Sequence, residues 1–358
     1  MPELPEVETV RSILAPRLIG LSFTAIKVFW PKTIATGADK MASALPGRRI
    51  ESLSRRGKFL VFGLAGGLSL VGHLRMEGKL FLFANGTHWP GKFDRVVFSL
   101  SDGSELVFAD VRKFGRFWLY GKGEKPACLQ ALGPEATDLS APYVLAVLKK
   151  STRPVKEVLL DQTRFAGIGN IYADEICFAC RINPFYPGRR LATAQIAASI
   201  AENAHLILTR AIALHGSSVR TYRASNEISG QYQTCLNVYS RAGKPCRICQ
   251  SPIMKRALNG RGTSYCPNCQ GVPEVIGITG GIAAGKTTIR KILEQYGYRS
   301  LDADSLVKDL YREKPTAAQL RKHFPWLFTA SGEIEKSKVR DMLTADGRER
   351  RKWLGIVY

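Results

Sequence analysis

The spacing of apolar side chains changes along the chain and predicts parts of different architecture. Between residues 20 and 120, short runs alternate apolar and polar positions and are broken by Gly and Asn. A period of two predicts antiparallel strands, arranged as a sandwich or a barrel. The clearest runs are Lys58–Phe62, Leu80–Phe83, Arg95–Leu100 and Phe117–Tyr120.

The period becomes helical between residues 141 and 212. Apolar positions recur every three or four residues in 141–149 and again in 192–214, which predicts amphipathic helices. Between them, Gly167-Ile-Gly-Asn170 is a glycine-rich turn that opens a helix. Residues 216–240 are polar and rich in Gly and Ser, so we expect a mobile loop there.

The charge of the chain points to a polyanionic partner. The 358 residues have room for two or three domains and carry a net charge of +22, with a pI of about 9.8. Residues 1–271 hold 36 basic and 19 acidic side chains, so most of the excess lies there. Nucleic acid or an anionic membrane surface fits this balance. No apolar run reaches the roughly 18 residues of a membrane span, and the charged start does not resemble a signal peptide. We therefore expect a cytoplasmic protein without a membrane partner.

Four of the eight cysteines form a metal-binding pattern. Cys246 and Cys249 are followed, sixteen residues later, by Cys266 and Cys269. Each C-x₂-C pair supplies two corners of a tetrahedron from one tight turn, and four thiolates exclude water. We predict one structural Zn²⁺ rather than free thiols.

The N-terminus offers a nucleophile. If Met1 is removed, Pro2 carries a free secondary amine with a pKa of about 7.7–8, partly neutral at pH 7. Such an amine can attack a sugar C1′ and form a Schiff base, and Glu3 and Glu6 lie beside it as proton donors or as holders of the amine. The alternative is an ordinary helix start that is rich in Pro and Glu.

A phosphate-binding pattern begins after residue 271. The strand-like run 275–279 precedes a G-x-x-x-x-G-K-T motif, and a helix follows. In a P-loop, backbone amides hold phosphates, the lysine reaches the β- and γ-phosphates, and the threonine holds Mg²⁺. The motif residues are Gly280, Gly285, Lys286 and Thr287, and they predict ATP and Mg²⁺ as ligands.

Residues 1–271 resemble a bacterial formamidopyrimidine-DNA glycosylase, an enzyme that removes 8-oxoguanine and ring-opened purines from double-stranded DNA. Leu4 favours this branch over the sister branch that acts on oxidised pyrimidines. Besides the cysteines, the matching motifs are Pro2–Glu8, Arg55–Lys58, Gly72–Met76, Arg112–Gly115 and Gly167–Ala173.

The resemblance implies a multidomain α+β protein, and we expect it to be a monomer. We expect a catalytic β-sandwich over 1–130 and a helix–two-turn–helix domain over 131–234. A zinc finger is expected over 235–271. The segment 216–234 resembles the family's lesion-capping loop, although residues 224–230 depart from its pattern.

The resemblance also assigns roles in catalysis. Pro2 attacks C1′, and Glu3 protonates the opening sugar ring or relays protons to it. Lys58 lies near the abasic phosphate and assists β-elimination. Asn170, at a helix start, and Arg261, on the finger, bind phosphate, and Arg261 is a candidate for δ-elimination.

Base chemistry in a duplex requires extrusion of the nucleotide, and the gap must be filled. Met76, Arg112 and Phe114 match the family's void-filling residues: Phe114 wedges into the stack and Arg112 pairs with the orphaned cytosine. Taken alone, Met76 and Phe114 would be interpreted as core residues. His73 and Lys156 match further family positions on the DNA side.

Residues 272–358 resemble the start of dephospho-coenzyme A kinase, which phosphorylates a ribose 3′-hydroxyl. In that case Asp302 or Asp304 orients or deprotonates the hydroxyl. The pattern supplies two strands and a few helices, whereas a P-loop kinase needs a sheet of about five strands and a lid. We therefore expect a truncated α/β segment that is inactive alone.

Two alternatives remain open. The chain could recognise lesions through its zinc finger without cleaving them, although Pro2, Glu3 and Lys58 together favour catalysis. It could also be a dual-function enzyme whose kinase half is completed by another chain.

Overall fold

The chain divides into two compact units, Met1–Glu274 and Val275–Tyr358. The computed structural model describes residues 2–217, 230–271, 277–281, 284–295, 300–301, 306, 309–311, 314–329, 331–345 and 347–357. The middle of the predicted loop, 218–229, therefore lies outside the described residues. None of the described helices is long and apolar enough to cross a membrane.

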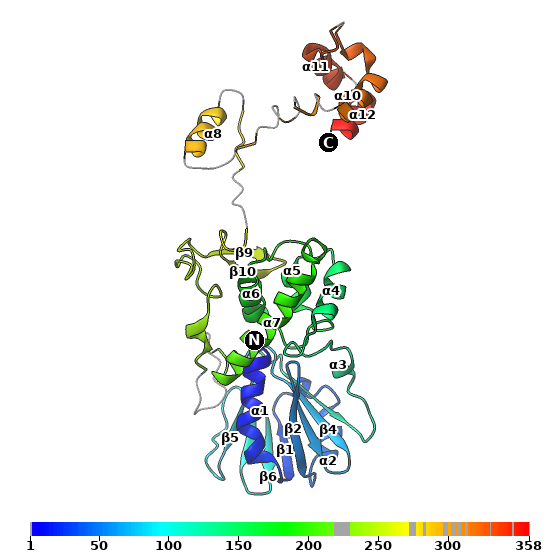
Figure 1. Ribbon diagram of the computed structural model, residues 1–358. Helices are drawn as coiled ribbons and strands as arrows, with labels where there is room; N and C mark the ends of the chain where they lie inside the picture. The colour runs from blue at the N-terminus through cyan, green and yellow to red at the C-terminus, as the bar shows by residue number, and fades with distance from the viewer. Residues whose placement is uncertain are drawn as a thin grey trace. The chain divides into compact units, whose positions relative to one another are not determined.

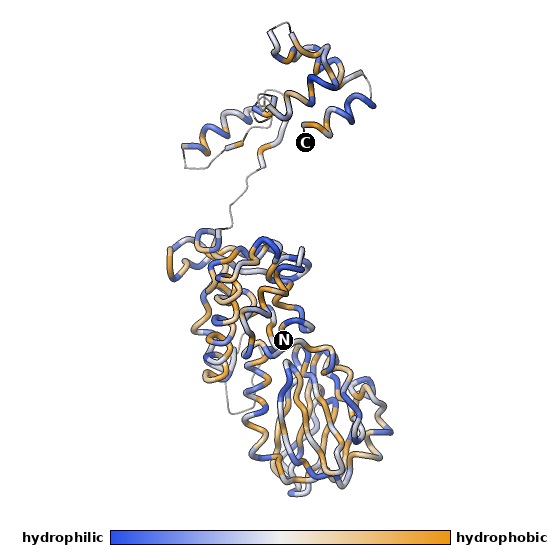
Figure 2. The backbone as a smooth tube through the Cα atoms, turned by 45° about the vertical axis from the view of Figure 1, so that its right-hand side comes forward, coloured by the Kyte–Doolittle hydropathy of each residue, from blue (hydrophilic) through white to orange (hydrophobic). Residues whose placement is uncertain are grey.

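The first unit begins with helix α1, Leu4–Leu18, which packs along a sandwich of two antiparallel sheets (Figure 1). Its core comes from the alternation in the sequence, with Phe62, Phe98, Phe108 and Phe117 all buried between the sheets. Figure 2 shows apolar colour along the strands and hydrophilic colour in many of the turns. One sheet has the order β1-β6-β7-β5 and the other β2-β3-β4-β8. The strands are β1 Phe23–Val28, β2 Ile50–Arg56, β3 Phe59–Leu64, β4 Leu68–His73, β5 Lys79–Phe83, β6 Asp94–Leu100, β7 Glu105–Ala109 and β8 Arg116–Tyr120.

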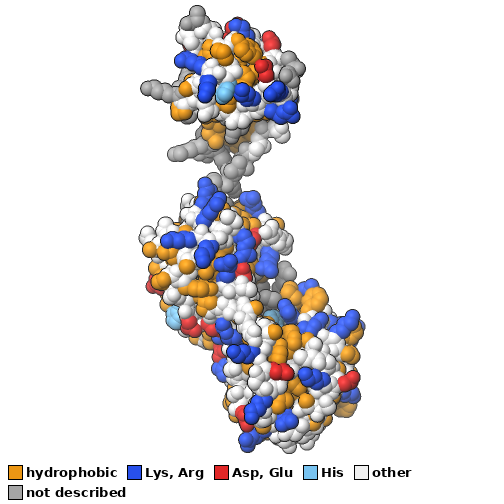
Figure 3. Space-filling model, turned by 90° about the vertical axis from the view of Figure 1, so that its right-hand side faces the viewer, with side chains coloured by type: hydrophobic (Ala, Val, Ile, Leu, Met, Phe, Trp, Pro, Cys, Tyr) orange, Lys and Arg blue, Asp and Glu red, His pale blue; other side chains and the backbone are white. Residues whose placement is uncertain are grey.

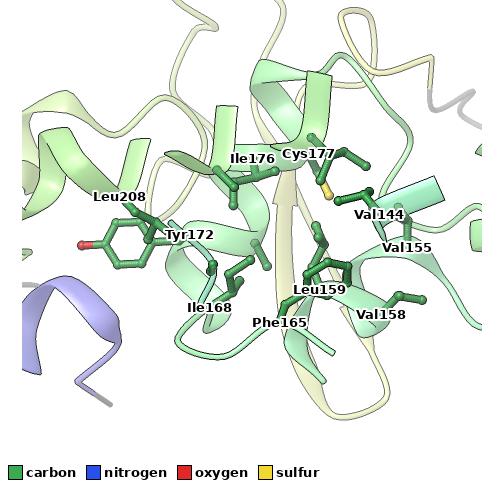
Figure 4. Packing of buried hydrophobic residues seen from close by; sticks show 14 of the residues in the cluster. Val144, Val155, Val158, Leu159, Phe165, Ile168, Tyr172, Ile176, Cys177 and Leu208 are labelled. Atoms are coloured by element: carbon green, nitrogen blue, oxygen red, sulfur yellow. The ribbon is translucent and has the colours of Figure 1, made fainter. Parts of the chain in front are cut away.

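Helices follow the sandwich and surround a second core. The side chains of Ser140 and Thr193 cap the helices that begin after them, by accepting hydrogen bonds from backbone amides. Figure 4 shows the core around helix α6, where Tyr172 and Ile176 meet residues of the neighbouring helices. The helices are α3 Ala127–Gln130, α4 Ala141–Lys149, α5 Val155–Leu160, α6 Asn170–Ala179 and α7 Ala194–Ala213.

A two-stranded hairpin closes the first unit. Strand β9, Met254–Leu258, pairs with β10, Arg261–Tyr265, and the cysteine pairs flank them. A small cluster containing Cys246, Ile253 and Cys266 packs against Phe178 at the end of α6. The hairpin is therefore attached to the same helix that forms the centre of the second core.

The second unit has its own small core. Leu320, Phe324 and Trp353 lie among the buried side chains that join helices α10 Lys314–His323, α11 Lys336–Ala345 and α12 Gly347–Val357. Helix α8, Lys286–Gln295, follows the glycine motif and exposes Ile289 and Ile292. Among the described residues of 277–357 there is no strand longer than an isolated bridge. The expectation of a strand over 275–279 is wrong for 277–279, where no strand among the described residues pairs with the chain.

Candidate active site and zinc centre

The carboxylate of Glu3 lies at the N-terminus of helix α6. Its oxygens accept hydrogen bonds from the amides of Gly169 at 2.7 Å, Ile171 at 2.9 Å and Tyr172 at 3.3 Å. These amides have no partner within the helix, and the helix dipole favours an anion at this end. Burial raises the pKa of Glu3, while Lys58 and the amides oppose that shift. The site therefore combines a buried carboxyl with donors that stabilise its charged form.

Two glycines allow Glu3 and Leu4 to lie against the start of α6. A Cβ at Gly169 would lie 2.2 Å from Cδ of Glu3, and one at Gly167 would lie 2.5 Å from a methyl of Leu4. Gly167 also has a φ of 104°, which side-chain-bearing residues avoid. The glycine turn predicted from the sequence thus lets residues 3 and 4 lie against the start of α6.

Glu6 forms a second buried anchor, and its role was only partly expected. Its side chain accepts hydrogen bonds from the amide of Glu3 at 2.9 Å, the hydroxyl of Tyr172 at 2.7 Å and the amide of Ser217 at 2.7 Å. In Figure 4 the Tyr172 hydroxyl points out of the apolar cluster toward α1. Glu6 therefore joins α1, α6 and the residue that precedes segment 218–229.

Lys58 is held near Glu3 by a charged turn. Glu135 accepts hydrogen bonds from Arg55 at 2.6 Å, Arg56 at 2.7 Å and the amide of Gly57 at 2.7 Å. Lys58 itself is only 4% exposed. Burial lowers its pKa to about 8; Glu3 opposes this shift, and Arg261 adds to it. The motif Arg55–Lys58 is thus a turn fixed by Glu135, and Pro2, Glu3 and Lys58 are all buried in this region.

His73 lies at the end of β4 as a neutral ring. Its Nδ1 accepts a 2.9 Å hydrogen bond from the amide of Arg75, so the proton resides on Nε2. Burial, with Arg75 and Lys58 beside it, lowers the pKa of His73 to about 3. The ring can therefore offer a phosphate an N–H group but no charge at pH 7.

Met76, Arg112 and Phe114 are on the surface rather than in the core. Met76 is 40% and Phe114 47% exposed, and the Arg112 guanidinium lies 4.9 Å from the centre of the Phe114 ring. The turn that carries the last two is fixed by Asp110, whose carboxylate accepts from the amides of Arg112 at 3.0 Å and Gly115 at 2.8 Å. An interpretation as core residues is wrong for both apolar side chains.

Lys156, which the resemblance assigns to the DNA side, lies in the interior. The residue is fully buried, and its ammonium is 2.7 Å from Asp174, 2.9 Å from the carbonyl of Gly262 and 3.0 Å from the hydroxyl of Thr263. Its ammonium is thus held inside the protein by two hydrogen bonds and an ion pair, and its contact with DNA stays a prediction. Asn170 begins α6 as expected and also donates to Gly262, at 3.0 Å.

The four cysteine sulfurs form a compact cluster. They lie within 4.8 Å of one another, with Cys246 and Cys269 3.9 Å apart and Cys249 and Cys266 3.4 Å apart. A tetrahedron of Zn–S bonds of about 2.3 Å places sulfurs about 3.8 Å apart. The cluster therefore fits one structural Zn²⁺. Arg261 is exposed at the start of β10 in the same hairpin.

Helix α6 holds the hairpin and the segment before it through acidic residues that sequence reasoning missed. Glu175 accepts hydrogen bonds from the amides of Asn237, Val238 and Tyr239 at 2.9–3.0 Å. Asp174 accepts from the amide of Ser264 at 2.8 Å, and burial raises its pKa to about 7 although Lys156 opposes the shift. Their position beside the turn 167–170 was the only signal in the sequence.

The lysine of the glycine motif in the second unit binds two carbonyls of the same motif. Nζ of Lys286 donates to the carbonyls of Gly280 at 2.7 Å and Gly281 at 2.6 Å, and Thr287 is exposed on the first turn of α8. Asp302 and Asp304 lie outside the described residues.

Lys and Arg side chains are scattered over the face of the first unit shown in Figure 3 and outnumber the acidic side chains there. Arg112, Lys113 and Arg261 are among the exposed cations. A surface of this kind fits a polyanion, as the composition predicts.

Family models match the chain in four segments. Residues 1–117 match the formamidopyrimidine-DNA glycosylase N-terminal domain, and 131–223 match the H2TH domain of the same glycosylase. Residues 243–272 match a zinc finger found in FPG and IleRS, and 274–358 match dephospho-CoA kinase.

Similar proteins cover the first three of these segments. The formamidopyrimidine-DNA glycosylase of Lactiplantibacillus plantarum is 42% identical to this chain in an alignment that covers 75% of this chain and 98% of the relative. That of Listeria innocua is 44% identical, and the alignment covers 75% of this chain and 100% of the relative. Two Lactococcus lactis Fpg structures also align with 75% of this chain and 99% of their own. One is a mutant in complex with Fapy-dG containing DNA, with a TM-score of 0.71 and 39% identity. The other is bound to DNA containing an abasic site, with a TM-score of 0.70 and 38% identity.

Proposed function

This chain belongs to the formamidopyrimidine-DNA glycosylase family, and from that premise we propose that it excises oxidised purines and then cleaves the abasic strand. The single observation that carries the proposal is the place of Glu3. A buried carboxyl next to Pro2 is fixed by amides of α6 and lies in the field of Lys58. The substrates are 8-oxoguanine and formamidopyrimidines in double-stranded DNA.

The proposed first step is attack by Pro2. After removal of Met1, its secondary amine forms a bond to C1′ and gives up its proton, and the bond from C1′ to the damaged base breaks as the base takes up a proton. Glu3 gives a proton to the ring oxygen as the sugar opens, which leaves an iminium ion at C1′. The raised pKa of Glu3 supports this role, because it enlarges the fraction of molecules in which the carboxyl still holds a proton to give.

The proposed second stage is β,δ-elimination from the iminium ion. Loss of the C2′ proton expels the 3′-phosphate, and a further elimination expels the 5′-phosphate. Lys58, with its pKa lowered to about 8, is placed to assist the first of these near the phosphate. Arg261 holds the flanking phosphate, with Asn170 and the neutral His73 as further contacts. A single chain carries all these groups, so a monomer suffices.

The exposed trio supports a role in base extrusion. Phe114 inserts into the base stack next to the gap, and Arg112 hydrogen-bonds the cytosine that has lost its partner. Met76 fills the space that the extruded base leaves in its strand. Their exposure and the turn fixed by Asp110 support this, because a wedge must be both accessible and rigid.

Borohydride trapping tests the proposal. A duplex with one 8-oxoguanine opposite cytosine should give a protein–DNA adduct, and the cross-linked peptide should be the one that begins at Pro2. Pro2→Gly should lose most of the adduct, and a duplex with guanine in place of the lesion should give none. An adduct mapped to a lysine would refute the assignment.

We also propose that the second unit binds ATP and Mg²⁺ without acting as a kinase by itself. Lys286 and Thr287 stand at the start of α8, directly after the glycines of the motif, which supports nucleotide binding. The described residues of this unit form helices and no sheet, and phosphoryl transfer needs both substrates positioned.

A further inference from the structure

A buried ion pair in the first unit has no part in the steps proposed above. Lys156 on α5 and Asp174 on α6 lie 2.7 Å apart, and their side chains are 1% and 0% exposed. Burying two charges costs desolvation free energy, so such a pair is weak evidence for stability and calls for another reason.

Both residues of the ion pair bind strand β10, which begins at Arg261. Lys156 donates to the carbonyl of Gly262 and to the hydroxyl of Thr263, and Asp174 accepts from the amide of Ser264. The three residues that follow Arg261 are therefore each held by one partner of the pair. A two-stranded hairpin alone is only marginally stable, so these contacts fix the direction in which Arg261 leaves the strand.

The same helix holds Glu3. The first turn of α6 binds the Glu3 carboxylate through the amides of Ile171 and Tyr172, and Asp174 lies just beyond them on that helix. We propose that Lys156 and Asp174 are positioning residues that fix Arg261 relative to Glu3. They set the distance between Arg261, which binds the flanking phosphate, and the reacting sugar. This inference rests on the proposed contact of Arg261 with the DNA backbone.

A double-mutant cycle on the full chain tests it. Lys156→Met/Asp174→Asn removes both charges, and the new amide oxygen can still accept from Ser264. Loss of both charges together avoids the unpaired buried charge that a single change leaves. Strand cleavage should fall about 10- to 100-fold in kcat, because misplacement of a positioned group by about 1 Å has effects of that size. KM should rise as well, and the log–log salt dependence of DNA binding should be flatter by about one unit, because the misplaced Arg261 no longer holds its phosphate.

The cycle is completed with Arg261→Ala. In the wild-type background this change should weaken cleavage and flatten the log–log salt dependence of DNA binding by about one unit. In the Lys156→Met/Asp174→Asn background, Arg261→Ala should change neither cleavage nor the salt dependence of binding, because Arg261 is already misplaced there. Arg112→Ala is the matched control, and its effect should be the same in both backgrounds.

The outcomes separate this inference from the proposed function. If Arg261→Ala has no effect in wild type, the proposed role of Arg261 fails, and the inference falls with it. If Arg261→Ala acts equally in both backgrounds, only the positioning role is overturned. Zinc content and cooperative unfolding are measured for each variant. If the double variant does not fold, Thr263→Val replaces it, because this change removes one contact of Lys156. The effect of Arg261→Ala is then compared between wild type and the Thr263→Val background.

Discussion

Oε1 of Glu3 accepts a 2.9 Å hydrogen bond from the amide of Ile171, which lies 168 positions further along the chain. This bond attaches the N-terminal segment of the sandwich unit to the helix that also carries the zinc hairpin. The catalytic geometry thus depends on how closely the segment 167–171 can approach residue 3.

Gly169→Ala tests that dependence. The new methyl would meet the Glu3 carboxyl at 2.2–2.6 Å, so Glu3 must leave its amide donors. We expect base release to fall by about 100-fold or more, while zinc content and non-specific DNA binding stay unchanged. Excision of 8-oxoguanine under single-turnover conditions measures this. Gly121→Ala, where the nearest atom is 3.5 Å away, is the matched control. Normal excision by Gly169→Ala would show that the contact is dispensable.

Lys58 should make folding stability depend on alkaline pH. Its pKa is lowered to about 8 in the folded chain, from 10.5, so between these values only the unfolded chain holds the proton. The free energy of unfolding therefore rises with pH across this window, by about 3 kcal/mol, and the gain is lost as pH falls through 8. Urea unfolding of Lys58→Met from pH 7 to 10 should lack this rise. Lys40→Met, at an exposed position on α2 (Ala38–Ala44), should keep it.

The sequence predicted the elements well where periodicity is local. The helix over 141–149 has the predicted bounds, and the alternating runs near 60 and 98 lie in strands β3 and β6. The cysteine spacing predicted a cluster that the sulfurs form. Short-range patterns suffice in these cases, because the burial of one face or the geometry of one turn determines the outcome.

The supporting carboxylates could not be predicted in the same way. Glu135 meets Arg55 across 80 positions, and Glu175 meets Asn237 across 62, so no local pattern pairs them. The interior partner of Lys156 could not be predicted for the same reason. A cation in a basic protein is expected at a polyanion, and only the fold shows that Asp174 neutralises it in the interior.

Phe114 should matter only after the base has left the stack. Phe114→Ala removes the ring but leaves the turn fixed by Asp110, so non-specific affinity should change little. Excision should fall by about tenfold or more, because the cost of unstacking is no longer offset. Fluorescence anisotropy on undamaged DNA and single-turnover excision measure the two effects. Val111→Ala, at an exposed position of the same turn, is the control. Equal losses in both assays would make Phe114 a simple contact residue.

The zinc hairpin should be required for DNA binding but not for the sandwich. Cys249→Ser removes one thiolate, and the small cluster around Cys246 and Ile253 is too small to hold the hairpin without metal. We expect loss of zinc and of DNA affinity, while the core of the two sheets still unfolds cooperatively. Metal analysis and binding titrations test this. Cys235→Ser, outside the sulfur cluster, should behave as wild type. DNA binding by a zinc-free chain would contradict the role of the hairpin.

The second unit should not form coenzyme A by itself. Its described helices pack around Trp353, and Lys286 binds the carbonyls of its own loop, so a nucleotide must first displace those contacts. Positioning of a second substrate and neutralisation of the transferred group need a sheet and cationic side chains that the described residues do not assemble. We therefore expect ATP binding, detectable by equilibrium titration with Mg²⁺ and weakened by Lys286→Ala, without phosphorylation of dephospho-CoA. Lys291→Ala, on the same helix, is the control for charge.

Glycosylase activity should be equal in the wild type, Lys286→Ala and Lys291→Ala, because every residue proposed for base excision lies before residue 272. Robust product formation that Lys286→Ala abolishes would instead make this chain a dual-function enzyme.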